Sequence, residues 1–200
     1  MPVGYAPWGP VNVPVALGSL QDAVRVFGSA DGLSGYQLPL ALEHYFSVAG
    51  PQGRVLALRG FNAGTQDLDT YRAKAAIKDA AGNDVLIVKA AHPGALGNKF
   101  KVDIATGRQN NEFLIVLWGR GLPETFYWRA TASAEDEMRA LIEAWNKVAN
   151  SLGSDFRLEL PLIANVPTFN PNPPDPARVL PKTPVRPSDQ GRKIEILRRR

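Results

Sequence analysis

The sequence predicts an α+β protein: a small mixed α/β layer, an antiparallel β-sheet or sandwich, and an extended Pro-rich C-terminal arm. Near the N-terminus, two helix-like amphipathic segments lie between two short apolar runs, a pattern typical of an α/β layer. Five short runs of strand character, separated by turn residues, follow between residues 73 and 130 and favour antiparallel strands. Residues 161–190 hold nine of the 17 prolines, which excludes a regular helix or a central strand.

The N-terminal part is expected to alternate strands and helices. Residues 1–10 contain three prolines and two glycines and are expected to form an extended arm. Ser19 is the predicted N-cap of the first helix, which Gly28 ends. Pro14 lacks an N–H, so its strand should lie at a sheet edge or contain a bulge. In order, the expected elements are a strand at Val11–Leu17, helices at Leu20–Phe27 and Tyr36–Ala49, and a strand at Arg54–Phe61 running parallel to the first.

The rest of the body, which we expect to span residues 11–160, should be mostly β-structure. Its expected strands are Ala73–Lys78, Val85–Ala90, Lys99–Ala105, Glu112–Trp118, Thr125–Ala130 and Phe156–Leu160. One long helix should begin after Ser133, with Met138, Leu141, Ile142, Trp145, Val148 and Ala149 as a single apolar stripe. Residues 161–200 should form a Pro-rich tether followed by a terminal arm.

Composition excludes several function classes. Residues 1–160 carry 15 Lys+Arg and 16 Asp+Glu, a net charge of −1, whereas residues 161–200 carry 8 and 3, a net of +5. The body therefore lacks the basic balance of a nucleic-acid-binding domain. The chain has no cysteine, which excludes disulfides and Cys-based zinc sites. It also has no apolar run of 18 residues, so we expect no membrane span.

No residue cluster has the spacing of a catalytic or cofactor site. The two histidines, His44 and His92, are not in a metal-binding pattern. Gly94–Lys99 differs from a phosphate loop, because only two residues separate its glycines and Phe100 stands where Ser or Thr is needed. The acidic pairs Asp67/Asp69 and Asp136/Glu137 are explained by helix capping and solvation. We expect no catalytic residue, metal, cofactor or small-molecule substrate.

The C-terminus has the pattern of an interaction arm. Lys193, Ile194, Glu195, Ile196 and Leu197 alternate as a strand would, and such a segment can add to the sheet edge of a neighbouring subunit. The Pro-rich run before it would serve as the spacer. The basic terminus consists of Arg192, Arg198, Arg199 and Arg200. It either contacts nucleic acid or an acidic neighbour, or it is a solvated chain end.

Three blocks of the chain resemble contractile-tail sheath proteins of phage tails and type VI secretion. The corner within Ile87–Ile104, IVKAAHPGALGNKFKVDI, is similar to the family's A-x-x-P-G-x-x-G-N corner. Val13–Phe27 is similar to its opening segment, and Tyr36–Arg59 to its helix and following strand. Leu114–Asn146 is similar to a further strand and helix segment. The blocks follow the family's order and cover most of Val11–Leu160. Family sheaths are usually longer, so the resemblance is to a short or truncated form.

The resemblance implies a virion structural protein rather than an enzyme. A sheath-like chain would assemble as rings or a sleeve around a tail tube, in the virion tail after assembly in the host cytoplasm, with its terminal arms adding strands to neighbouring subunits. Its partners would be copies of itself and the tube or other tail proteins; no membrane or direct nucleic-acid contact is expected. The alternative is a basic-tailed nucleic-acid-binding protein, or a tail, collar or baseplate accessory protein without contraction.

Overall fold

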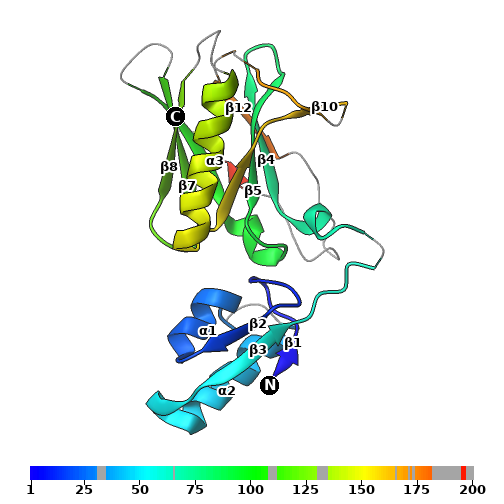
Figure 1. The fold of residues 1–200 in the computed structure, drawn as a ribbon, viewed down its shortest axis with the longest axis vertical. Helices are drawn as coiled ribbons and strands as arrows, with labels where there is room; N and C mark the ends of the chain where they lie inside the picture. The colour runs from blue at the N-terminus through cyan, green and yellow to red at the C-terminus, as the bar shows by residue number, and fades with distance from the viewer. Residues whose placement is uncertain are drawn as a thin grey trace.

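The computed structural model describes residues 1–30, 35–64, 66–107, 112–129, 135–164, 166–170, 172, 174–181 and 195–196. These residues form two lobes (Figure 1). The N-terminal lobe comprises residues 1–60. The sandwich lobe comprises the described residues from 73 onward, and a short 3-10 helix, η2 (Leu68–Tyr71), lies between the two. The predicted α+β class is confirmed, since helices and mainly antiparallel sheets occur together.

A three-stranded sheet with helices on one face builds the N-terminal lobe. Its strands are β1 (Val3–Gly4), β3 (Val55–Arg59) and β2 (Pro14–Leu17), in that spatial order. Its helices are α1 (Leu20–Phe27) and α2 (Gln37–Ala49), followed by η1 (Gly50–Gln52). β2 lies at an edge, as Pro14 predicts. The expected parallel pairing was wrong for β2 and β3, which are antiparallel; two successive helices, not one crossover helix, separate them.

Local signals in this lobe act as the sequence predicts. The Ser19 hydroxyl accepts a hydrogen bond from the Asp22 amide at 3.1 Å, which caps α1. Gly28 ends the helix with φ of 86°, a conformation that glycine adopts without a Cβ clash. The lobe has its own apolar core beneath the helices, formed by Ala6, Leu17, Ala23, Phe27, Leu38, Leu42, Phe46 and Ala57.

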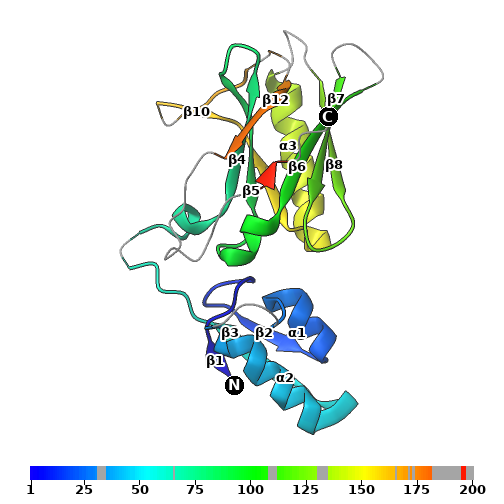
Figure 2. The same ribbon diagram turned by 180° about the vertical axis from the view of Figure 1, so that it is seen from behind.

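Two four-stranded sheets pack face to face in the sandwich lobe (Figure 2). The first sheet runs β12 (Pro174–Pro181), β4 (Lys74–Asp79), β5 (Asp84–Ala90), β9 (Phe156–Glu159). The second runs β13 (Glu195–Ile196), β6 (Lys101–Thr106), β7 (Glu112–Trp118), β8 (Glu124–Arg129). All pairings are antiparallel except β13 with β6, which is parallel. Apolar residues from both sheets form one core.

Helix α3 (Glu135–Leu152) closes one side of this sandwich. It contacts β9 of the first sheet and β8 of the second. The Trp145 indole donates to the Thr125 carbonyl of β8 at 3.1 Å. The neighbouring Asn146 donates to the Leu158 carbonyl of β9 at 2.8 Å and accepts from its amide at 2.9 Å. Two consecutive side chains thus hydrogen-bond the main chains of two edge strands, which would otherwise present unpaired groups.

The prediction that all six apolar residues of α3 form one buried stripe was wrong. Met138, Ile142 and Ala149 are buried against the core. Leu141 and Val148 instead remain 41% and 56% exposed. The sequence pattern merged two neighbouring helix faces, because residues at i, i+3 and i+4 spacing are compatible with either face. The predicted cap Ser133 lies outside the described residues.

Beyond residue 160, where the sequence predicts an extended Pro-rich tether, the described residues include three strands. Leu162–Ile163 (β10) and Val166–Pro167 (β11) form a short hairpin. Pro174–Pro181 then pairs with β4 at the edge of the first sheet, with a register shift between Pro174 and Val179. Proline is compatible with this position because an edge strand leaves one row of backbone groups unpaired. No described helix is both long and apolar enough to cross a membrane.

Candidate functional site

The joint between the lobes is built around a tryptophan that the sequence reasoning did not single out. Trp8 belongs to the N-terminal lobe, yet its side chain is 1% exposed and packs in the core of the sandwich lobe. Its ring meets Phe100 and His92 edge to face, at centroid distances of 5.1 and 5.2 Å. The Arg120 guanidinium lies 5.0 Å from the ring centroid. Within residues 1–10, which were expected to form an extended arm, β1 pairs with β3 and Trp8 packs into the core of the other lobe.

Arg59 holds the backbone on both sides of this tryptophan. It is the last residue of β3 and is fully buried. Its Nε donates to the Ala6 carbonyl at 2.9 Å and its Nη1 to the Gly9 carbonyl at 2.6 Å, whereas Nη2 has no hydrogen-bond partner among the described residues. Burial lowers the pKa of Arg59 to about 10, so the group stays charged at neutral pH. In the sequence, strand alternation places Arg59 on the same face as the apolar residues Val55 and Ala57. That alternation was the signal that this cation is buried.

The Pro-Gly corner packs against the backbone of Pro7, next to Trp8. It contains a 3-10 helix, η3 (Ala95–Lys99), and carries the chain from β5 of the first sheet to β6 of the second. Gly94 has φ of 143°, and a Cβ there would lie 2.2 Å from the Pro7 carbonyl oxygen. The Leu96 amide donates to that oxygen at 3.3 Å, and the Gly94 amide donates to the Tyr71 carbonyl at 3.4 Å. With these amides engaged, the corner does not offer the N–H cradle of a phosphate loop.

A second tie between the lobes is made by Arg120, which an ion pair with Asp155 of the same lobe holds in place. The Asp155 carboxylate, 6% exposed, accepts from the Arg120 amide at 2.6 Å, from Nε at 2.8 Å and from Nη2 at 2.6 Å. Arg120 Nη1 also donates to the Arg25 carbonyl of α1. A groove of about 890 Å³ lies beside this pair and is lined by residues of both lobes. Removing either partner would leave the other charge without its counter-charge, which is strongly destabilising for a buried group such as Asp155.

His92 lies inside the joint but lacks the chemistry of a general base at neutral pH. Burial lowers its pKa, and the positive charges of Arg72, Arg59, Arg157 and Arg120 lower it further, to about 3. The side chain is therefore neutral at pH 7 and serves as an aromatic contact for Trp8. The other histidine, His44, is exposed on α2. Within the described ranges, no group of three or more His, Asp or Glu is placed to hold a metal ion.

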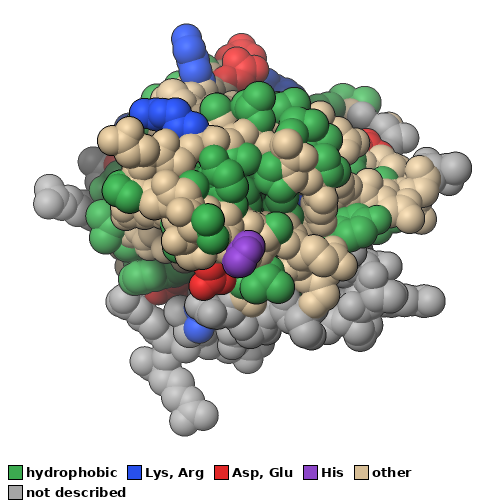
Figure 3. All heavy atoms as spheres, turned by 90° about the horizontal axis from the view of Figure 1, so that it is seen from below, with side chains coloured by type: hydrophobic (Ala, Val, Ile, Leu, Met, Phe, Trp, Pro, Cys, Tyr) green, Lys and Arg blue, Asp and Glu red, His purple; other side chains and the backbone are tan. Residues whose placement is uncertain are grey.

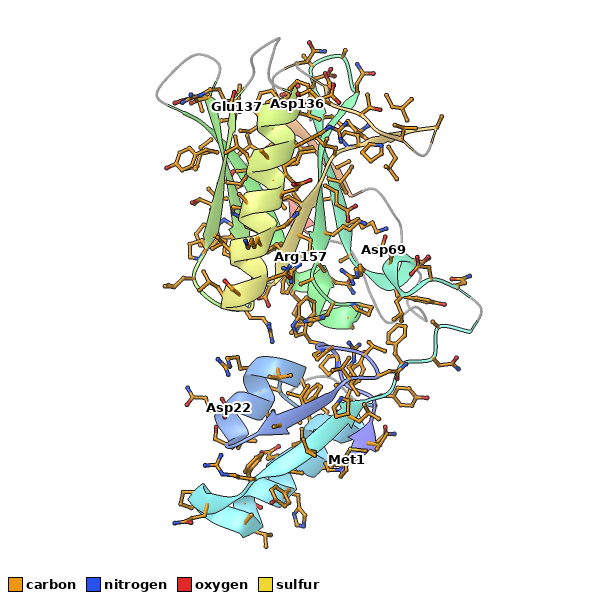
Figure 4. All side chains as sticks on the ribbon, in the orientation of Figure 1. Met1, Asp22, Asp69, Asp136, Glu137 and Arg157 are labelled. Carbon is orange, nitrogen blue, oxygen red and sulfur yellow. The ribbon has the colours of Figure 1, made fainter. Side chains whose placement is uncertain are left out.

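The acidic pairs noted in the sequence do not form a common site. Figure 4 places Asp69 near the lobe joint and Asp136 and Glu137 at the far end of α3. Asp69 accepts from Lys74 at 2.5 Å and from Lys89 at 3.0 Å. Burial raises its pKa, but these lysines outweigh the burial, and the net pKa is lowered. A carboxylate held ionised in this way is a poor general acid.

The predicted inter-subunit arm is only partly within the described residues. Glu195 and Ile196 pair in parallel with Lys101 and Val102 of β6; Figure 2 shows this short strand beside β6. Lys193, Ile194 and Leu197 lie outside the described residues, as do the basic terminal residues Arg192, Arg198, Arg199 and Arg200.

Comparison with known proteins gives a partial likeness among solved structures only. No protein-family model matches the chain, and no curated protein matches it. Among solved structures, the fold is similar to a sheath tail protein from Listeria innocua, with a TM-score of 0.45 and 16% identity. The match covers 62% of this chain and 25% of that protein. The functional proposal therefore rests on this chain's own residues.

Proposed function

We propose that this chain is a structural subunit of a contractile-tail-like particle, assembling with copies of itself as rings or a sleeve around a tail tube. One observation carries the proposal: the three sequence blocks that resemble sheath proteins, though distant in the chain, meet at the lobe joint. A Cβ at Gly94 of the corner would lie 3.0 Å from Arg59 Nη2 of the second block. A Cβ at Gly28, just after the first block, would lie 3.8 Å from Leu96 of the corner.

Strand exchange through the C-terminus is the assembly contact we propose. The β6 edge accepts Glu195–Ile196 through backbone pairing, and the same edge can take this segment from another copy because backbone hydrogen bonds do not distinguish chains. Thirteen residues, 182–194, connect Pro181 to Glu195. A linker of this length spans at most roughly 45 Å. An element that pairs within its own chain or a neighbour's is the basis of domain swapping.

The test is a matched pair of arm variants in the full chain. Ile196→Pro removes a backbone donor and disfavours the strand, whereas Ile196→Thr keeps both the donor and the β-propensity. Wild type and Ile196→Thr should form rings or tubes in negative-stain images and fast-sedimenting species. Ile196→Pro should stay small, with an unchanged circular dichroism spectrum.

Three outcomes would oppose the proposal in different ways. Assembly by Ile196→Pro at wild-type levels would show that this arm does not tie subunits together. A strictly monomeric wild-type chain at high concentration would contradict the structural-subunit function. Salt-sensitive DNA binding that disappears when residues 192–200 are deleted would instead favour the nucleic-acid-binding alternative.

A further inference from the structure

Arg59 is a fully buried cation that no anionic side chain among the described residues pairs with. Its Nε and Nη1 donate to backbone carbonyls, which accept hydrogen bonds but do not cancel the positive charge. Nη2 is enclosed as well, and no described residue accepts a hydrogen bond from it. The Phe61 ring, whose centroid lies 5.3 Å from the guanidinium carbon, offers a cation–π contact only. Arginine is almost never fully buried unless it is paired, so these surroundings indicate an anionic partner that those residues do not provide.

Arg72 supplies a second enclosed donor. Its Nε is buried and has no hydrogen-bond partner within the described ranges. The Asp69 carboxylate lies 3.7 Å from this nitrogen, which is beyond hydrogen-bond distance. The same carboxylate accepts from Lys74 at 2.5 Å and from Lys89 at 3.0 Å, and Lys89 also pairs with Glu159. Because three cations share Asp69, the charge of Arg72 is only partly neutralised.

The two arginines stand at opposite ends of the segment that joins the lobes, and these ends meet beside the Pro-Gly corner. Arg59 ends β3, and Arg72 directly follows η2. A Cβ built on Gly94 would lie 3.0 Å from Arg59 Nη2. The Gly94 amide donates to the carbonyl of Tyr71, the residue before Arg72, at 3.4 Å. The rings of Phe61 and Tyr71 are 5.2 Å apart, which closes the segment on itself and brings both guanidinium groups to the corner.

His92 lies within the field of this positive charge. Burial lowers its pKa most, and nearby arginines, above all Arg72 and Arg59, lower it further. Burial also lowers the pKa of Arg157, and the charge of Arg72 adds to that effect. Figure 4 shows Arg157 at the end of the sandwich lobe that faces the joint. The joint therefore has a positive potential, although residues 1–160 as a whole carry one more acidic than basic residue.

We propose that Arg59 Nη2 and Arg72 Nε bind a single chloride ion at the lobe joint. Both donor atoms are enclosed, which favours a monatomic anion over phosphate or a carboxylate. Figure 3, which views the end of the molecule formed by the N-terminal lobe, shows hydrophobic side chains over much of the surface and few Lys or Arg side chains. A polyanion such as nucleic acid would therefore find little positive charge to follow there.

The bound ion would act on the relative position of the two lobes. It would neutralise the buried charge of Arg59, since an uncompensated buried charge is strongly destabilising. It would also connect the last residue of β3 to the residue that follows η2, and so hold both ends of the joining segment together. This site goes beyond the proposed assembly and does not depend on it.

The dependence of stability on chloride tests this site in the full chain. Sodium chloride replaces sodium gluconate at constant ionic strength, so the screening of exposed charges stays the same, and gluconate is too large for an enclosed site. An anion that binds only the folded chain stabilises it by mass action. For a dissociation constant of about 1 mM, raising chloride from about 1 to about 100 mM should increase the melting temperature by roughly 5–9 °C.

The matched variants are Arg72→Gln and Arg129→Gln. Arg72→Gln removes one of the two enclosed donors and leaves the backbone contacts of Arg59 in place, so most of the chloride-dependent shift should disappear. Arg129 carries an exposed guanidinium that pairs with Glu112, so Arg129→Gln should keep the wild-type shift. Crystals of the wild-type chain grown in bromide locate the ion by its anomalous scattering, and we expect a peak beside Arg59 Nη2.

Each outcome has a defined meaning. A shift that Arg72→Gln loses and Arg129→Gln keeps supports the site. Equal melting temperatures in chloride and gluconate overturn it and assign both donors to buried water; a shift that Arg72→Gln retains also overturns it. If Arg72→Gln does not fold, a bromide peak beside Arg59 Nη2 supports the site and the lack of that peak overturns it. A peak without a chloride-dependent shift means binding at crystal concentration only, which overturns the proposal as well.

Discussion

Truncating Trp8 should lower the stability of the protein and allow the N-terminal lobe to unfold before the sandwich lobe. The side chain is 1% exposed and fills a site bounded by Phe100, His92 and the Arg120 guanidinium. Trp8→Ala removes these contacts and leaves a cavity, which costs about 3–5 kcal/mol of unfolding free energy for a buried aromatic residue. For a chain of 200 residues, each kcal/mol shifts the melting temperature by roughly 2–4 °C. We expect a loss of roughly 6–20 °C and earlier unfolding of the N-terminal lobe.

Urea denaturation followed by circular dichroism, together with calorimetry, measures this effect. Hydrogen exchange of residues 1–60 would report the loosened lobe. Trp118→Ala is the matched control, because Trp118 is 38% exposed at the end of β7, and surface substitutions usually change stability by about 0.5 kcal/mol or less. If Trp8→Ala and Trp118→Ala destabilise the protein equally, the burial of Trp8 does not stabilise the contact between the lobes.

Two further predictions concern the same joint. Gly94→Ala should destabilise the protein by roughly 2–4 kcal/mol in urea unfolding, because φ is 143° and the new Cβ would lie 2.2 Å from the Pro7 oxygen; Gly121→Ala, with open space around it, should change little, and equal effects would contradict the close-packing argument. The pKa of His92 is about 3 in the folded chain and about 6.5 when unfolded. Only the unfolded chain therefore gains this proton as the pH falls from about 6.5 to 3, and stability should drop by up to about 1.4 kcal/mol per pH unit. His92→Gln should flatten that part of the pH profile, and an unchanged slope would oppose the neutral buried histidine.

Short-range signals predicted the local elements well. The Ser19 cap, the Gly28 stop and the alternation in Val55–Arg59 each depend on a few neighbouring residues, so they can be read from the sequence. The corner was also recognised, but only as a turn. Its contact with Pro7 joins residues more than eighty positions apart in the chain. A local sequence pattern cannot predict such a contact. The candidate site was missed for the same reason, because Trp8, Arg120 and Asp155 come from three distant segments.

The sequence by itself determined the α+β class, most of the helices and strands, and the absence of a recognisable catalytic or metal-binding motif, because periodicity, capping residues and motif spacing are local properties. Only the tertiary structure decided which faces of those elements are covered. Burial depends on what packs against an element: one side of α3 is core while the next is open, and a supposed N-terminal arm is instead fastened by Trp8 and Arg59. The tertiary structure likewise decided that the edge of β6 pairs with Glu195–Ile196, the pairing on which the proposed strand exchange depends.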